Sequence, residues 1–187
     1  RVKSMPALLG EADLVKTLQQ LPGVAVGTEG MTGLYVRGGG ADENLYLLDG
    51  NPVYHVNHLL GFFSAFNPDA IKNTRFYKGS FPAEYGGRLS SVVDVRMNDG
   101  SRQEYHGNIS VGLLSARANL EGPIVKDRSS FNVSVRRTWL DLITGTTLAV
   151  ANKNSSIKDA FGYHFFDINA KLNHSFSDRS RAYLSFY

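Results

Sequence analysis

Apolar and polar residues alternate toward the end of the chain, a pattern typical of β-strands with two different faces. From Phe165 to Phe176 the even positions are apolar apart from His174, and the odd positions between them are polar. After Ser177-Asp178-Arg179-Ser180, which is typical of a turn, the alternation continues to the last residue. We therefore predict strands over residues 163–176 and 180–187.

The same alternation predicts three more strands upstream. Residues 131–139 carry apolar side chains at odd positions apart from Arg137, which predicts a strand over 129–140. The alternation within 105–120 changes phase by one residue, which indicates a tight turn or a bulge. We interpret it as a hairpin turning near 112–115, with strands over 105–111 and 116–122. One long bulged strand is the alternative.

The first hundred residues have a different pattern. Leu14, Leu18 and Leu21 recur at helical spacing before Pro22-Gly23, which predicts a helix over 11–21. Short apolar strands follow over 33–38, 45–50, 75–79 and 91–96, with a helical turn expected over 68–72. Four glycines, at positions 38, 50, 79 and 86, follow these strands, where we expect positive φ or close backbone approach.

The order of these motifs resembles the plug domain of TonB-dependent outer-membrane receptors. The resemblance covers residues 14–97 and includes Leu-Pro-Gly-Val, Arg37-Gly38, Leu-Asp-Gly-x-Pro at 48–52, and Lys78-Gly79. The motif Phe-Pro-Ala-Glu-Tyr-Gly-Gly-Arg-Leu-Ser-Ser at 81–91 is similar to that of Bacteroidetes-type receptors. Such receptors pass from plug directly into a transmembrane β-barrel, as the alternating strands indicate.

The resemblance implies an α+β plug domain over 1–100, a small mixed sheet with short helices, followed by antiparallel β-hairpins that begin a barrel over 101–187. It implies an outer-membrane transporter that binds an external siderophore, cobalamin or glycan and imports it with energy from TonB. TonB would act through an N-terminal segment upstream of Arg1. Outer-membrane lipid and a surface lipoprotein are further implied partners. No enzymatic activity or cofactor is expected.

Strand direction predicts which loops face outward. Short turns near 125–128 and 177–179 would face the periplasm, and 143–161 would form an external loop. We expect 45–49 to run in the same direction as 75–79, which places 27–31, 51–58 and 80–88 outside. The predicted ligand-contacting residues are Glu29, Asn51, Tyr54, His55, Asn57, His58, Phe81, Glu84 and Tyr85.

Two arginines are predicted to latch the plug to the barrel, because Arg37 and Arg75 resemble family positions where basic plug residues face acidic barrel residues. A solvated arginine at a strand end is the alternative for each. The apolar run 59–66 is interpreted as plug core, with contact to an apolar substrate as the alternative.

Composition narrows the class of protein. The 187 residues contain no cysteine, which excludes disulfides and thiolate metal sites. No apolar run approaches the roughly 20 residues of a membrane helix, and no signal peptide opens the chain. The net charge of +3 comes from scattered basic residues, so no nucleic-acid partner is expected. His55 and His58 lack further ligands for a metal site.

A soluble α+β interaction module is the alternative function. Such a module would need partners to cover the apolar strand residues, among them Phe166, Leu172 and Phe186. In a barrel wall these residues would contact lipid. Because plugged transporters use about 22 strands, five strands cannot close a barrel, and we expect their edges to be partly unpaired.

Overall fold

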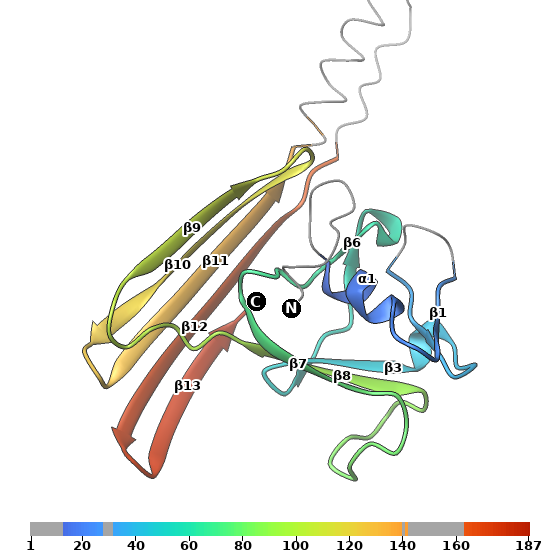
Figure 1. The fold of residues 1–187 in the computed structure, drawn as a ribbon, viewed down its shortest axis with the longest axis horizontal. Coiled ribbons are helices and arrows are strands. Elements are labelled where there is room, and N and C mark those ends of the chain that lie inside the picture. The colour runs from blue at the N-terminus through green and yellow to red at the C-terminus, as the bar shows by residue number, and fades with distance from the viewer. Residues whose placement is uncertain (1–12, 28–31, 140, 142–162) are drawn as a thin grey trace, which may run out of the picture.

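A computed structural model describes residues 13–27, 32–139, 141 and 163–187. The described part is mostly strand, with one short α-helix. Figure 1 shows a broad five-stranded sheet on one side and a compact N-terminal unit, residues 13–99, on the other. No described helix has the length and apolarity needed to span a bilayer.

The N-terminal unit is built around a four-stranded mixed sheet with the order β4-β3-β8-β7. Its strands are β3 (Asn44–Leu48), β4 (Asn51–Pro52), β7 (Ile71–Tyr77) and β8 (Ser91–Met97). Strand β8 lies between β3 and β7 in the sheet, and all its residues except Arg96 are buried. Smaller elements complete the unit: α1 (Leu14–Gln19), β1 (Val24–Ala25), β2 (Tyr35–Val36), η2 (Ala41–Glu43), β5 (Asn57–His58), η3 (Leu59–Gly61) and β6 (Phe63–Ser64).

The apolar core lies on one face of this sheet, against α1. Alternation along β8 places Val93, Val95 and Met97 on that face, where they pack with Leu14 and Leu18. Because α1 presents these leucines, it buries its apolar side against the sheet. Val92, Asp94 and Arg96 therefore point to the opposite face.

The helix is shorter than predicted. Asp13 caps it, since its Oδ1 accepts hydrogen bonds from the backbone amides of Val15 (2.8 Å) and Lys16 (3.2 Å). The helix ends at Gln19, so Leu21 lies beyond it and is 39% exposed instead of buried. The predicted extension to residue 21 was wrong because the chain already turns at Gln20 toward Pro22-Gly23.

Two other local predictions need correction. The turn expected over 68–72 ends at Ala70, whose amide donates to the Asn67 carbonyl, and Ile71 already begins β7. Gly86 has neither a positive φ nor close neighbours; the left-handed residue is Gly87, with φ of 80°. Gly38, Gly50 and Gly79 do have positive φ, as predicted.

The direction predicted for residues 45–49 was also wrong. Strand β3 pairs parallel with β8, whereas β7 pairs antiparallel with it, so β3 and β7 run in opposite directions. The prediction assumed that β3 and β7 run in the same direction. In the structure β8 lies between them, and its parallel pairing with β3 sets β3 opposite to β7.

The five-stranded sheet is antiparallel, with the order β13-β12-β11-β10-β9. Its strands are β9 (His106–Val111), β10 (Ser115–Val125), β11 (Ser129–Thr138), β12 (Phe166–Ser177) and β13 (Ser180–Phe186). The Gly112 amide donates to the Ser115 carbonyl at 2.8 Å, so the phase change is a hairpin and not a bulge. Each strand lies within a few residues of its predicted range.

The two faces of this sheet differ sharply. One face exposes large apolar side chains, including Ile109, Leu120, Phe166, Leu172 and Leu184. The other buries polar residues against the N-terminal unit, among them Asn132, Ser134 and Asn169. The alternation in the sequence therefore divides an apolar outer face from a polar inner face.

Candidate functional site

Charged residues of the inner face are buried where the five-stranded sheet meets the N-terminal unit. Arg136 on β11 donates through Nε to Asp167 Oδ2 on β12 at 2.7 Å. Its Nη2 also donates to the backbone carbonyl of Ser64, at 2.7 Å, in the N-terminal unit. The two side chains are 1% and 3% exposed, so the ion pair is isolated from solvent.

His58 adds a third member to this pair. Its Nε2 lies 2.7 Å from Asp167 Oδ1, the carboxylate oxygen that Arg136 Nε does not use. The imidazole stacks on Phe165, with ring centroids 4.1 Å apart. Next to it, the Leu59 amide donates to the Tyr163 hydroxyl at 3.0 Å. These contacts hold the β5–η3–β6 hairpin against β12.

A second charged cluster surrounds Lys171, also on β12. Lys171 Nζ lies 3.1 Å from Asp49 Oδ1 and 3.0 Å from Asp99 Oδ1, and it donates to the Met97 carbonyl at 3.3 Å. The ammonium also lies 4.6 Å from the centre of the Tyr183 ring. Lys171 thus ties the Leu-Asp-Gly turn and the end of β8 to the sheet.

Asp99 is stabilised as a carboxylate in this cluster. Its partial burial opposes ionisation, but its contacts with Lys72 and Lys171 outweigh that effect and lower the pKa of Asp99. The Lys72 Nζ lies 2.6 Å from Asp99 Oδ2. Asp99 therefore remains charged at neutral pH.

Further polar contacts cross the same junction. Arg117 Nε lies 3.5 Å from Asp69, and the Asn67 amide donates to the Ser134 hydroxyl at 2.7 Å. Asn98 donates to Glu121, so the end of β8 is also fixed to β10. We call these contacts, together with the Arg136 and Lys171 clusters, the polar junction.

The predicted ligand-contacting residues divide between the two faces of the four-stranded sheet. Asn51, Tyr54, His55 and Asn57 are exposed, and Val53 and Val56 between them pack on the α1 side of the sheet. His58 lies in the polar junction. Glu29 falls outside the described residues.

Phe81, Glu84 and Tyr85 belong to the opposite face. The Tyr85 hydroxyl lies 3.5 Å from Asp94 Oδ2, and its ring packs 5.5 Å from Tyr77. The segment joining β7 to β8 lies below the sheet in Figure 1, away from α1. Residues 51–58 and 80–88 nevertheless meet at two hollows, one lined by Pro52 with Glu84 and Tyr85, and another lined by Tyr54 with Arg88. The predicted ligand contacts stay a prediction.

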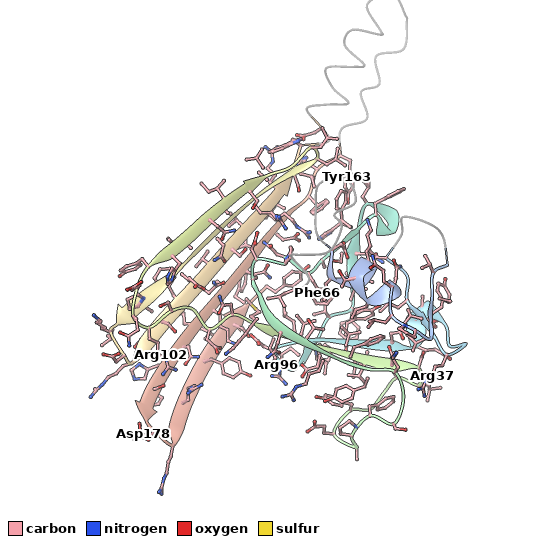
Figure 2. The ribbon with its side chains drawn as sticks, in the orientation of Figure 1. Arg37, Phe66, Arg96, Arg102, Tyr163 and Asp178 are labelled. Atoms are coloured by element: carbon pink, nitrogen blue, oxygen red, sulfur yellow. The ribbon has the colours of Figure 1, made fainter. Side chains whose placement is uncertain are left out.

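A hollow of about 350 Å³ lies between the two segments, and residues of both line it. Leu45, Leu47, Pro52 and Arg96 line it together with Glu84 and Tyr85. Arg96 lies on this lower face in Figure 2 and contacts the fully buried carboxylate of Asp94 at 3.2 Å. The hollow has charged and apolar walls.

Arg37 and Arg75 lie away from the polar junction. Both are exposed, and Figure 2 places Arg37 on the side of the N-terminal unit remote from the five-stranded sheet. In the described residues, the sheet supplies the cations Arg117, Arg136 and Lys171 to the junction. It also supplies two carboxylates, Asp167, which faces His58, and Glu121. The N-terminal unit supplies carboxylates, including Asp49 and Asp99.

The sequence analysis missed these junction residues, although a signal was present. Arg136, Asp167 and Lys171 all occupy polar positions of strongly alternating strands. Long charged side chains on the face opposite an apolar surface would point to a polar partner. Which carboxylate faces which cation could not be derived from alternation alone.

Comparison with known proteins identifies the N-terminal unit. Residues 4–93 match the family model described as TonB-dependent Receptor Plug Domain. Among curated proteins, none matches the chain.

Solved structures resemble the chain as a whole. The siderophore receptor PirA from Acinetobacter baumannii is 22% identical, with a TM-score of 0.63, and the match covers 92% of this chain and 28% of that one. A mutant of the ferric enterobactin receptor PfeA from Pseudomonas aeruginosa is also 22% identical, with a TM-score of 0.63, over 92% of this chain and 29% of that one. The chain thus spans less than a third of these receptors, and the likeness concerns the fold.

The predicted resemblance to TonB-dependent receptors is confirmed by the family match, while the Bacteroidetes-type subgroup stays a prediction. The family consists of outer-membrane transport receptors and not of enzymes, as the sequence indicated. The described core packs on α1 and a polar junction joins it to a five-stranded sheet, and residues 4–93 of this chain, which include most of the N-terminal unit, belong to the TonB-dependent receptor plug domain family.

Proposed function

We propose that this chain is part of an outer-membrane receptor that imports a siderophore with energy from TonB, and that its plug, over residues 1–100, gates the path. Residues 101–187 would begin the barrel wall. The observation that carries the proposal is the two-faced sheet, since its inner face buries ionic contacts to the plug and its outer face exposes apolar side chains.

An apolar outer face suits contact with lipid. Leu172 and Leu184 are 45% and 68% exposed, and they lie directly opposite each other on β12 and β13. Membrane barrels alternate between apolar outward and polar inward residues in this way. A soluble interaction module would leave this face in water, so the observation favours the barrel wall.

The direction of the strands supports an assignment of sides. Short turns join β10 to β11 and β12 to β13 at the end of the sheet where Figure 2 marks Asp178, and Tyr163 marks the other end. The Tyr163 end has the short β9–β10 turn but also the long connection from Thr138 to Phe166. Because barrels have long external loops and short periplasmic turns, we assign this end to the outside. The β5–η3–β6 hairpin then lies near the external end.

Siderophores are the proposed ligand class because the structurally similar proteins include the siderophore receptor PirA and the ferric enterobactin receptor PfeA. Cobalamin and glycans, and a surface lipoprotein as a partner, stay predictions from the family resemblance. Among the predicted contacts, Tyr54, His55, Asn57 and His58 are on or near the hairpin assigned to the outside. The latch role predicted for Arg37 and Arg75 also stays a proposal.

The test is TonB-dependent uptake of radioactive iron supplied as ferric enterobactin, by cells that express the receptor carrying this chain. We expect uptake in cells with TonB and loss of uptake in otherwise identical cells that lack it. The protein should be recovered in the outer-membrane fraction. Uptake that persists without TonB, or recovery in the soluble fraction, would contradict the proposal.

A further inference from the structure

The His58 side chain is held in a single orientation by two contacts. Its Nε2 lies 2.7 Å from Asp167 Oδ1, and its ring lies flat on Phe165, at an interplanar angle of 20°. The first contact fixes the direction of one ring nitrogen, and the second fixes the plane of the ring. Few rotations of the imidazole remain open.

The carboxylate that holds His58 is fixed in turn. Arg136 Nε donates to Asp167 Oδ2 at 2.7 Å, so Oδ1 faces His58. Arg136 is itself buried and donates to the Ser64 carbonyl at 2.7 Å. The arginine therefore balances the aspartate charge and determines which carboxylate oxygen the histidine meets.

This arrangement selects one tautomer. Arg136 keeps the Asp167 carboxylate ionised through Oδ2, and the other oxygen, Oδ1, can then only accept a hydrogen bond, so Nε2 of His58 carries the proton. In neutral imidazole the other nitrogen, Nδ1, then has a free lone pair. Within the described residues Nδ1 has no hydrogen-bond partner, and the side chain is 22% exposed.

We propose that His58 contacts the external ligand through Nδ1, which accepts a hydrogen bond from a hydroxyl or N–H group, and that Asp167 and Arg136 are positioning residues that set its tautomer. The inference rests on the proposed function, which places this hairpin at the external end. It goes further by naming the atom, the polarity of the contact and the residues that impose it.

The first experiment measures the tautomer without any ligand. In ¹⁵N-histidine NMR of the receptor in detergent, the signals of His58 are those that disappear in His58→Gln, whatever the number of other histidines. We expect Nδ1 of His58 to be unprotonated in the parent protein. Protonated Nδ1 at neutral pH would overturn the proposal.

Asp167→Asn supplies the decisive comparison. Arg136 should keep the amide oxygen of the new side chain, because arginine only donates, and this turns the amide NH₂ toward His58. Nε2 must then accept a hydrogen bond, so the proton moves to Nδ1. The ¹⁵N chemical shift of Nδ1 should become that of a protonated nitrogen, and that of Nε2 should become that of an unprotonated one. If His58 keeps its tautomer in Asp167→Asn, the positioning role is wrong.

Ligand binding gives a second readout. We expect His58→Phe, which keeps the stacking, and Asp167→Asn each to weaken ferric enterobactin binding by roughly tenfold, the scale of one lost hydrogen bond. His106→Phe is the matched control and should bind as the parent does, because His106 is an exposed histidine at the start of β9, away from the β5–η3–β6 hairpin. Parent-like binding by His58→Phe would overturn the ligand contact.

The two proposals can fail separately. The tautomer measurement requires neither transport nor ligand. The uptake assay compares cells with and without TonB and leaves His58 unchanged. An absence of TonB-dependent uptake with the expected tautomers would reject the proposed function, and with it the ligand contact. Uptake with parent-like binding by His58→Phe would reject only the inference.

Discussion

Gly100 has the closest neighbour among the described glycines and lies at the junction between the plug and the five-stranded sheet. Its φ is +79°, and a Cβ atom there would lie 2.1 Å from the carbonyl oxygen of Phe131. Because that oxygen belongs to the backbone of β11, it cannot move without disturbing the strand. Both the positive φ and the lack of room for a Cβ atom therefore require glycine at this position.

We predict that Gly100→Ala lowers the free energy of unfolding by more than the roughly 1–3 kcal/mol expected for a left-handed alanine alone. Gly38→Ala is the matched control, since Gly38 has a similar φ of +84° and no atom within 4 Å of the added Cβ. Chemical denaturation monitored by tryptophan fluorescence measures both. Equal losses for the two variants would mean that the contact with Phe131 has no effect.

At the scale of elements, β12 is the strand that holds the plug. Its inward residues Asp167 and Lys171 form the two charged clusters, one near each end of the buried contact. A buried ion pair that loses one partner leaves an uncompensated charge. Removing Lys171 should therefore harm the junction more than removing an exposed lysine.

We predict that acid weakens the contact between Asp99 and β12. Since the folded-state pKa of Asp99 is lowered, its contribution to stability is complete above the unfolded-state pKa of about 3.9 and is lost as the pH falls through the folded value. Hydrogen exchange of residues 97–105 between about pH 5 and pH 2 should show faster opening at the acidic end. The exchange rates need correction for the intrinsic effect of pH.

The variant Lys171→Met tests the cause of that pH dependence. It removes one of the two cations that lower the pKa of Asp99 and leaves Lys72 in place. The acid-induced opening should therefore become smaller, while the junction is weaker at neutral pH. An unchanged pH dependence in Lys171→Met would assign the effect to other carboxylates.

At the scale of the whole molecule, the outer face of the sheet should decide membrane assembly. Leu172 lies near the middle of β12 on this face, and an arginine at the bilayer midplane of a barrel costs about 2–4 kcal/mol. We predict that Leu172→Arg reduces the folded fraction in lipid vesicles. The change in electrophoretic mobility between folded and unfolded forms measures it.

Leu113→Arg is the control for depth. Leu113 is 68% exposed but lies in the turn between β9 and β10, at the end of the sheet, where the cost should fall to about 0–1 kcal/mol. If both variants fold equally well in vesicles, the outer face does not meet lipid, and the soluble module regains support.

Much of the architecture could be predicted because it depends on local patterns. Alternation over 105–187 located five strands and the hairpin at Gly112, since a pleated strand needs only period two to separate its faces. The motifs ending in Gly38, Gly50 and Gly79 marked true left-handed positions. The family resemblance came from the order of these motifs. Each motif is a short continuous stretch, so it can be recognised without knowledge of the tertiary structure.

The pairing between segments distant in sequence could not be predicted from local patterns. Strand β8 lies between β3 and β7 and pairs parallel with β3, so β3 runs opposite to β7, whereas the sequence had indicated the same direction for both. Likewise, the charges of Arg136, Asp167 and Lys171 were visible as residues but not as pairs. Local periodicity determines which face a side chain occupies, whereas its partner depends on how the chain packs in three dimensions.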